Sequence, residues 1–492
     1  MPRSIFRQAL GLALLAAFAV APSACRPGNQ GDIKVLVIGG EPTLKDPAAG
    51  PLTPSDAVLA GNVAQGLVSF DANAQIVPGL AERWTVSDDG LSYIFRIAAV
   101  DWPTGGRVTA RQVARFLKRS IAGSSANSLK DTLGAVQDIV AMTDRVIEIQ
   151  LTAPRPNLLT LLAQPEFAIV RNGTGTGPFR EAAGRGPGGE LRLTREVASD
   201  EDVPNRHDEV LLAGAGAEQA VTAFAGGKAD LVLGGTFADL RFAQRVKLPR
   251  NALRFDPASG LFGLVPVRAD GPLADSDLRR LLSQAIDRDA LVGSLRVPGL
   301  AARATVLEPG LEGMPALTPP SWLLAPINDR RVRLAADARA MFGKNPKPTL
   351  RLWLPAGPGS DLLFNRLTTD WGVLGVVVER ARTLAAADLR LVDMVAPSAS
   401  AAWFLRQFRC QAVPLCDPEA DTLLDAARQT PIPAQRYALL AQAATRIDDA
   451  QLFLPLTAPV RWSLVSNRIQ GFAGNRYARH TLTDLQQKPG GD

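Results

Sequence analysis

The stretch NVAQGLVSFDANAQIVPGLAERWTVSDDGLSYIFRI (Asn62–Ile97) joins the end of a helical pattern to a strand pattern. Apolar residues recur at helical spacing from Val58 to Leu67, and Ser55 is the expected N-cap of this helix. At the other end, residues 91–97 alternate apolar and polar side chains, which predicts a strand with one buried face. The stretch therefore predicts a fold that mixes helices and strands.

The same mixture continues on both sides of this stretch. An aliphatic run, Ile33–Ile38, predicts a buried strand. Thr109 and Gln112 have the spacing of a capping box, so we expect a helix that begins one residue after Thr109. Leucines at spacings of three and four after Asp275 predict another helix, and Asp287–Leu295 predicts a further short one. The sequence as a whole indicates an α/β protein.

The N-terminal residues have the features of a secretory signal peptide, which we assign to residues 1–24. Arg3 and Arg7 precede an apolar run from Ala9 to Ala21, which is too short to span a bilayer. Small residues directly before Cys25 resemble a bacterial lipobox, in which this cysteine is lipidated. Pro22 departs from that pattern, and ordinary cleavage with Cys25 as a spare thiol is the alternative.

Composition argues against several functional classes. Removal of Arg3 and Arg7 lowers the formal net charge from +6 to +4, and no concentrated basic stripe suggests a nucleic-acid partner. His207 and His480 are the only histidines, and the common hydrolase, phosphate-loop and zinc-protease motifs are absent from the sequence. We therefore expect neither an enzyme nor a metal site or cofactor. The adjacent acids Asp448 and Asp449 are interpreted as charges at a surface turn or helix end.

After Cys25, the two remaining cysteines are Cys410 and Cys416, six positions apart. In an oxidising compartment such a pair predicts a disulfide that closes a small loop. A partial metal site is the alternative, although zinc needs four ligands and neither histidine is close in sequence.

Several segments, taken in order, resemble the family-five extracytoplasmic solute-binding proteins, which are the dipeptide, oligopeptide and nickel receptors of bacterial ABC importers. The most specific is Asn62–Ile97, which is similar to the family's "EGL…D…PGLAe.W..s.DGl.Y.F.l" run. The other matching segments are DWPTGGRVTARQV (Asp101–Val113), GTGPF (Gly175–Phe179), GGKADLVLGG (Gly226–Gly235), LADSDLRRLLSQAIDRDALV (Leu273–Val292), DWGVLGVVV (Asp370–Val378), DPEADTLLDAAR (Asp417–Arg428) and NRIQGFAGN (Asn467–Asn475).

This resemblance implies a two-lobed fold like that of type II periplasmic binding proteins, with an extra small domain inserted in lobe I. The implied hinge crossings lie near Phe255–Phe262 and Pro459–Val465. The implied division is as follows: lobe I at 25–45, 172–258 and 464–492, the inserted small domain at 46–171, and lobe II at 259–463.

The resemblance also implies a function. The expected protein is a periplasmic, membrane-anchored monomer that binds a small, peptide-like solute by hinge closure and delivers it to the permease subunits of an ABC importer. A non-transport binding module on the same fold, such as a sensor or an envelope chaperone, is the alternative. The segment DMVAPSASAAWFLRQFRC (Asp393–Cys410) motivates this alternative, because it lacks the aspartate that pairs with a peptide's amino terminus in related proteins.

Two places are candidates for contact with the solute. The loop Pro355–Ser360 follows a predicted strand and precedes a helix, so the backbone N–H groups of Gly357, Gly359 and Ser360 are placed to bind a carboxylate. A plain strand-to-helix turn is the alternative for this loop. Trp403 is a candidate for stacking on the solute, with a core aromatic as the alternative.

Overall fold

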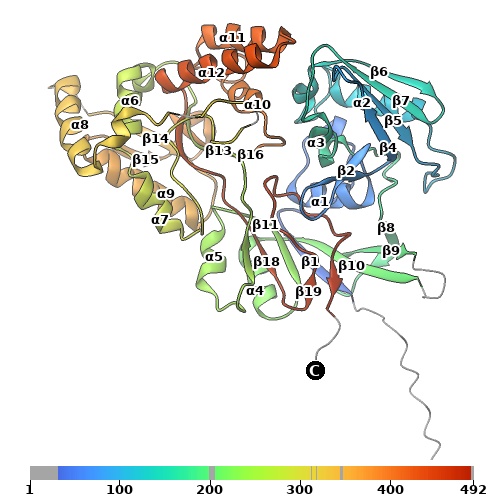
Figure 1. Cartoon of the computed structure of the whole chain (residues 1–492). Coiled ribbons are helices and arrows are strands. Elements are labelled where there is room, and N and C mark those ends of the chain that lie inside the picture. The colour runs from blue at the N-terminus through green and yellow to red at the C-terminus, as the bar shows by residue number, and fades with distance from the viewer. Residues whose placement is uncertain (1–31, 199–204, 312, 317, 344–346, 489–492) are drawn as a thin grey trace, which may run out of the picture.

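A computed structural model of the chain describes residues 32–198, 205–311, 313–316, 318–343 and 347–488. Its two larger β-sheets stand one above the other in Figure 1, and a third, smaller sheet lies to one side. The expected signal peptide and Cys25 lie outside the described residues. In the part of the chain that is described, no helix has the length and apolar character needed to cross a membrane.

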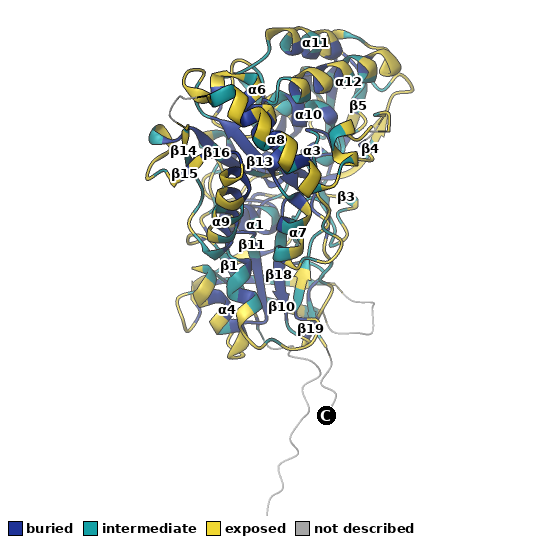
Figure 2. Cartoon of the chain, turned by 90° about the vertical axis from the view of Figure 1, so that its left-hand side faces the viewer, coloured by how far each residue is buried: buried dark blue, intermediate teal, exposed yellow. Residues whose placement is uncertain are grey.

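Seven strands form the first large sheet, and we call this sheet and the helices on it lobe I. Their order is β12 (Leu253–Phe255), β18 (Arg461–Val465), β11 (Leu231–Thr236), β1 (Ile33–Ile38), β10 (Arg206–Ala215), β9 (Leu191–Val197) and β8 (Arg180–Arg185). The helices of lobe I are α1 (Pro54–Val63), α4 (Ala217–Ala225) and α5 (Leu240–Arg245). The central strands β1, β10 and β11 are parallel, and their aliphatic side chains are buried, as Figure 2 shows.

Five strands form the second large sheet, which with its helices we call lobe II. Their order is β15 (Val377–Arg380), β14 (Thr349–Trp353), β16 (Leu389–Val395), β13 (Gly260–Pro266) and β17 (Leu454–Thr457). The helices are α6 (Ser276–Ala285), α7 (Arg288–Leu295), α8 (Ile327–Phe342), α9 (Pro358–Gly372), α10 (Ala401–Arg406), α11 (Pro418–Gln429) and α12 (Pro433–Asp449).

An antiparallel four-stranded sheet forms the core of the small domain. Its order is β4 (Ala81–Val86), β5 (Ser92–Ile97), β7 (Val146–Leu151) and β6 (Val136–Thr143), and it is covered by α2 (Ala110–Ile121) and α3 (Leu158–Leu162). The hairpin of β2 (Val68–Phe70) and β3 (Ile76–Pro78) leads into it, and the short pair β19 (Ile469–Gln470) and β20 (Gln486–Gln487) lies near the end of the chain.

Most of the predicted elements are confirmed. The strand at Ile33–Ile38 is β1, the alternating stretch forms β5, and α2 begins after Thr109 with both bonds of the capping box in place. The helices predicted after Asp275 and Asp287 are α6 and α7, each capped by the aspartate before it.

The predicted cap of the first helix was wrong. Thr53, and not Ser55, caps α1, because Pro54 occupies the first helical position and Asp56 completes a capping box with Thr53. The helix also ends at Val63, before the expected Leu67.

The chain crosses twice between the two lobes, and both crossings leave lobe I from neighbouring strands. β12 and β18 are paired, with Phe255 opposite Trp462. β12 leads to β13 of lobe II, and β17 of lobe II leads back to β18. The division into lobes remains a proposal. By strand pairing the return crossing lies between Thr457 and Arg461, so the expected boundary at 463 falls inside β18.

The last described residues tie the small domain to lobe I. The ring of Tyr477 stacks on Phe70 with centroids 5.4 Å apart, and the Asp484 carboxylate accepts a hydrogen bond of 2.8 Å from the backbone N–H of Ala72. Arg479 makes an ion pair of 2.5 Å with Glu166. Residues 70–72 and Glu166 of the small domain therefore contact residues 477–484, which lie near the C-terminal end of the described chain.

Candidate functional site

A cavity of about 630 Å³ lies between the small domain and lobe II, and we call it the interlobe cavity. Figure 1 shows the two walls facing each other, with α10, α11 and α12 on one side and α2 and α3 on the other. The small domain contributes residues 128–136, which include the 3₁₀ helix Lys130–Leu133, and residues 155–157 before α3. The volume of the interlobe cavity lies within the range of typical small-molecule sites.

Hydrogen bonds between side chains of the small domain and the segment before α10 close one end of this cavity. Asn157 Nδ2 donates to Ser398 Oγ over 2.9 Å, and Gln164 Nε2 donates to the carbonyl of Pro397 over 2.8 Å. Gln164 also accepts a bond of 3.1 Å from Arg479 Nε. Gln164 of the small domain is therefore hydrogen-bonded both to lobe II and to the C-terminal segment.

Trp403 is the one predicted solute-contacting residue that lines this cavity. It lies in α10, is only 4% exposed, and packs edge-on against Phe404 with ring centroids 5.1 Å apart. The side chain thus belongs to the core of lobe II and also forms part of the cavity wall. Its role in stacking on a solute remains a prediction.

The structure places Gly357, Gly359 and Ser360 elsewhere, in a region that we call the tight contact. There the start of α9 packs directly on Phe237 and Ala238 of lobe I, and Gly359 N donates to Ala238 O over 2.9 Å. A Cβ atom on Gly359 would lie 2.0 Å from Phe237 O, and one on Gly357 would lie 2.6 Å from Ala238 O. Gly357 also has a φ of 139°, which favours glycine. In this arrangement the N–H of Gly359 is bonded to lobe I, and the carboxylate site at this loop remains a prediction.

Sequence reasoning missed four arginines of the interlobe cavity. Arg155 comes from the small domain, whereas Arg406, Arg428 and Arg436 come from the end of α10, from α11 and from α12. No local motif marks them, because the residues are far apart along the chain and only the packing of the two walls brings them together.

The segment Asp393–Cys410 contributes no acidic side chain to the interlobe cavity. Asp393 lies in β16 and makes an ion pair of 2.8 Å with Arg461 at the return crossing. Burial raises the pKa of Asp393, while the charge of Arg461 acts in the opposite direction. Among the described residues that line the interlobe cavity from lobe II, none is acidic.

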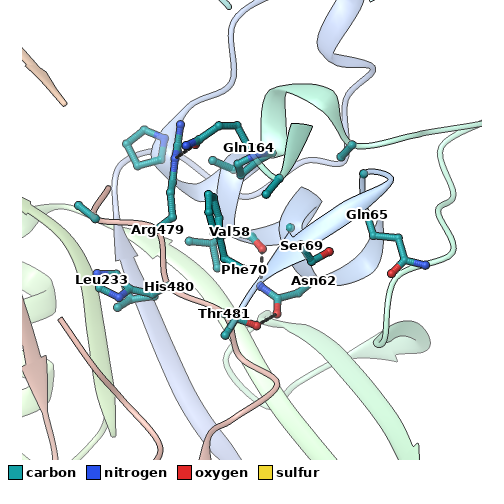
Figure 3. A pocket seen from close by; sticks show the side chains of 18 of the residues that line it. Val58, Asn62, Gln65, Ser69, Phe70, Gln164, Leu233, Arg479, His480 and Thr481 are labelled. Atoms are coloured by element: carbon teal, nitrogen blue, oxygen red, sulfur yellow. Dashed lines mark hydrogen bonds between the residues drawn. The ribbon is translucent and has the colours of Figure 1, made fainter. Parts of the chain in front are cut away.

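A second, smaller cavity of about 100 Å³ lies where α1 and β2 meet the C-terminal segment (Figure 3). Its polar groups are largely engaged with one another. Asn62 bonds to Val58 O and to the backbone N–H of Leu482, each over 2.8 Å, and His480 Nε2 lies 3.2 Å from the Asp256 carboxylate. We interpret this cavity as a packing space between lobe I and the small domain.

Metal binding has no support within the described residues, where no group of three histidine, cysteine or acidic side chains could hold an ion. The structure pairs Cys410 with Cys416, and the Cα atoms of the two cysteines lie 5.1 Å apart. The loop between them includes Gln411 and Ala412, which line the interlobe cavity.

The chain has two lobes joined by two crossings, and a cavity lies between lobe II and the small domain. This architecture is that of a two-lobed solute-binding protein. The model of the bacterial extracellular solute-binding proteins, family 5 (middle part), matches residues 75–338, which is more than half of the chain. The chain therefore belongs to family 5 of the bacterial extracellular solute-binding proteins. Membership of this family assigns the protein to solute binding outside the cytoplasm and not to catalysis.

Individual proteins of known sequence or structure agree with this assignment. The chain is 23% identical to a probable di/tripeptide-binding protein of Pseudomonas aeruginosa, over 86% of this chain and 89% of the other. Its fold is similar to that of Haemophilus influenzae OppA in complex with the peptide RPPGFSPFR, with a TM-score of 0.78 at 15% identity, covering 93% of this chain and 99% of the other. These likenesses confirm the two-lobed type II fold.

Two structures of one further protein are also similar to this chain. The Escherichia coli murein tripeptide-binding protein MppA gives a TM-score of 0.78 at 18% identity, over 94% of this chain and 99% of the other. An unliganded open form of MppA gives only 0.67 at 17% identity, over 94% of this chain and 98% of the other. The similarity of this chain to the unliganded open form is therefore lower than its similarity to the first MppA structure.

Proposed function

We propose that the protein captures a peptide or peptide-like solute in the interlobe cavity and delivers it to the permease subunits of an ABC importer. The observation that carries this proposal is the interlobe cavity itself, which has walls from both the small domain and lobe II. The peptide-binding relatives and the OppA–peptide complex support this class of solute.

Closure of the lobes is the proposed mechanism. A solute that touches both walls stabilises the closed arrangement by its greater affinity for that arrangement, and the permease then recognises the closed form. The bonds from Asn157 and Gln164 to the segment before α10 would form only when the walls meet. They would therefore contribute to the closed form alone.

The location of the protein follows from the same proposal. Lipidation of Cys25 after removal of residues 1–24 would hold the protein, as a monomer, at the outer face of the membrane. The pairing of Cys410 with Cys416 supports an oxidising compartment, in which such a disulfide forms and persists.

Native mass spectrometry of the mature protein, purified from its own envelope, tests the proposal. We expect one small solute per protein, released on gentle denaturation, and a smaller radius of gyration in X-ray scattering when that solute is added back. An empty protein that instead carries another protein would favour the sensor or chaperone alternative.

Matched variants test whether closure uses the contacts seen here. Asn157→Ala removes the bond to Ser398 and should weaken solute-induced compaction, with a loss of affinity of about fivefold. Asn365→Ala, on an exposed position of α9, is the control and should bind like the wild type. Equal compaction in the two variants would contradict the closure mechanism.

A further inference from the structure

The interlobe cavity has an unbalanced set of charged side chains. Six basic residues line it, together with a single acidic residue, Asp131. One of the six is neutralised, because Arg409 makes an ion pair of 2.7 Å with Asp425 and lies 3.6 Å from Asp421. Another, Lys130, keeps its charge but donates to the backbone carbonyls of Gly123 and Ser125, which uses two of its three N–H donors. Four arginines remain.

These four arginines, Arg155, Arg406, Arg428 and Arg436, have no carboxylate within ion-pair distance among the described residues. Three of them donate to backbone carbonyls, and Arg436 also donates to the hydroxyl of Tyr437. Arg155 donates to Arg428 O over 3.3 Å, Arg436 donates to Pro154 O over 2.8 Å, and Arg406 donates to Asp131 O. The Nε atom of Arg406 is buried without a partner. A guanidinium has five N–H donors, so most of this capacity is unused.

The four positive charges are close enough to act on one another. Burial of its guanidinium, together with the charges of Arg436, Arg406 and Arg428, lowers the pKa of Arg155 to about 10. Arg155 thus stays protonated at neutral pH, and its charge is opposed by those of its neighbours. An arrangement of this kind raises the free energy of the protein when no anion is present.

The repulsion acts across the interlobe cavity, since Arg155 belongs to the small domain and the other three belong to lobe II. Closure of the lobes brings like charges together. An anion between the two walls would attract the arginines of both walls and so favour closure. Carboxylates are suited to this role because they accept paired hydrogen bonds from guanidinium groups. The free energy of closure would then depend on the charge of the solute.

We infer that the solute of the interlobe cavity is an anion with at least two carboxylate groups, such as an acidic peptide, and that its charge makes closure favourable. The charge of Asp131 offsets part of the charge of Arg406, and the positive charge that remains is more than one carboxylate can neutralise. The inference rests on the proposal that this cavity is the solute site.

Binding of four probes to the mature protein, measured by calorimetry at low and at high salt, tests the inference. The probes are triglutamate, trialanine, trilysine and citrate. We expect triglutamate to bind at least about tenfold more tightly than trialanine at low salt, with a smaller difference at high salt because the charges are screened. Trilysine should not bind.

Variants link this preference to the arginines. Arg155→Gln and Arg428→Gln should each weaken triglutamate binding by about tenfold or more and leave trialanine within about twofold. Arg382→Gln, which removes the same charge from an exposed site outside the cavity, is the control and should leave both peptides unchanged.

The outcomes separate this inference from the proposed function. Equal binding of triglutamate and trialanine, unaffected by the arginine variants, would overturn the inference and leave the peptide receptor in place. Binding of citrate alone, dependent on Arg155 and Arg428, would support the anionic solute and contradict a peptide. Failure of all four probes to bind or to compact the protein would overturn both.

Discussion

Two of the regions where lobe II meets the rest of the molecule differ in character: the tight contact with lobe I and the interlobe cavity that faces the small domain. In the tight contact, the backbone of Gly359 lies directly on that of Phe237 and Ala238, and no space remains between the two lobes. The interlobe cavity instead has a volume of about 630 Å³ and is lined by four arginines that make no ion pair with any residue in the described part of the chain. The edge-to-face pair of Phe237 and Phe262, with ring centroids 4.8 Å apart, packs beside the tight contact.

The two regions are suited to two different roles, one in holding the lobes together and one in responding to a solute. Backbone packed on backbone has one close-fitting geometry, so the tight contact is suited to hold the lobes at a fixed separation. A cavity with charged walls is suited to respond to a solute. Three substitutions test whether the two regions differ in this way, and they follow in order of expected effect.

Gly359→Ala tests the tight contact. The added Cβ would lie 2.0 Å from Phe237 O, and a backbone atom cannot move aside cheaply, so we expect a loss of about 3 to 4 kcal/mol in the free energy of unfolding. Chemical denaturation measures this loss.

Gly372→Ala in the same helix is the matched control. A Cβ at this position would have no atom within 4 Å, so stability should change by less than about 1 kcal/mol. Equal losses in the two variants would show that the tight contact is not constrained as described.

Removal of the cysteine pair tests the wall of the interlobe cavity. The double substitution of Cys410→Ser and Cys416→Ser opens a short loop, and we expect a loss of about 2 kcal/mol in the oxidised protein. The same comparison made in a reducing agent should show no difference between the variant and the wild type. A difference that persists after reduction would mean that the serines perturb packing by themselves.

Asp448→Asn tests a buried acid at the end of α12, the helix that carries Arg436 into the cavity wall. The Asp448 carboxylate accepts a bond of 2.8 Å from Val306 N, and burial, together with the charge of Asp449, raises the pKa of Asp448 to about 7. The folded protein thus binds a proton at this site more tightly than the unfolded chain does. Its contribution to stability is present at low pH and is lost as the pH rises from about 4 to about 7.

We therefore expect the wild type to lose about 1 to 2 kcal/mol of stability from this group between pH 6 and pH 8. Asparagine keeps the acceptor oxygen and carries no charge, so the Asp448→Asn variant should lack this part of the pH dependence. Urea denaturation at several pH values measures the difference. Parallel pH profiles for the two proteins would contradict a raised pKa at Asp448.

The sequence predicted the elements well where local chemistry decides them. Thr109 and Gln112 define a capping box whatever lies around them, and the aliphatic run of β1 must be buried. Asp448 shows the limit of such reasoning. Its place at a helix end was expected, but the burial that raises its pKa depends on the segment around Val306, which is far away in sequence.

The candidate site could be predicted only in part for the same reason. Trp403 was identified within the segment that diverges from the related receptors, and it does line the interlobe cavity. The loop at Gly357 was predicted as an anion site because a helix begins there, and this stays a prediction; the sequence does not show that the loop packs on Phe237. The arginines carried no signal at all, since Arg155 and Arg436 become neighbours only when two domains meet.

The position of β18 has a consequence for how the chain comes to be folded. β18 lies between β11 and β12 in the lobe I sheet, so this sheet, which begins with β1 at Ile33, lacks an inner strand until Arg461–Val465 are available. Pairings over such long separations form slowly. A chain that leaves the ribosome from its N-terminus would therefore stay incompletely folded through most of its synthesis, a state that suits passage through a secretion channel.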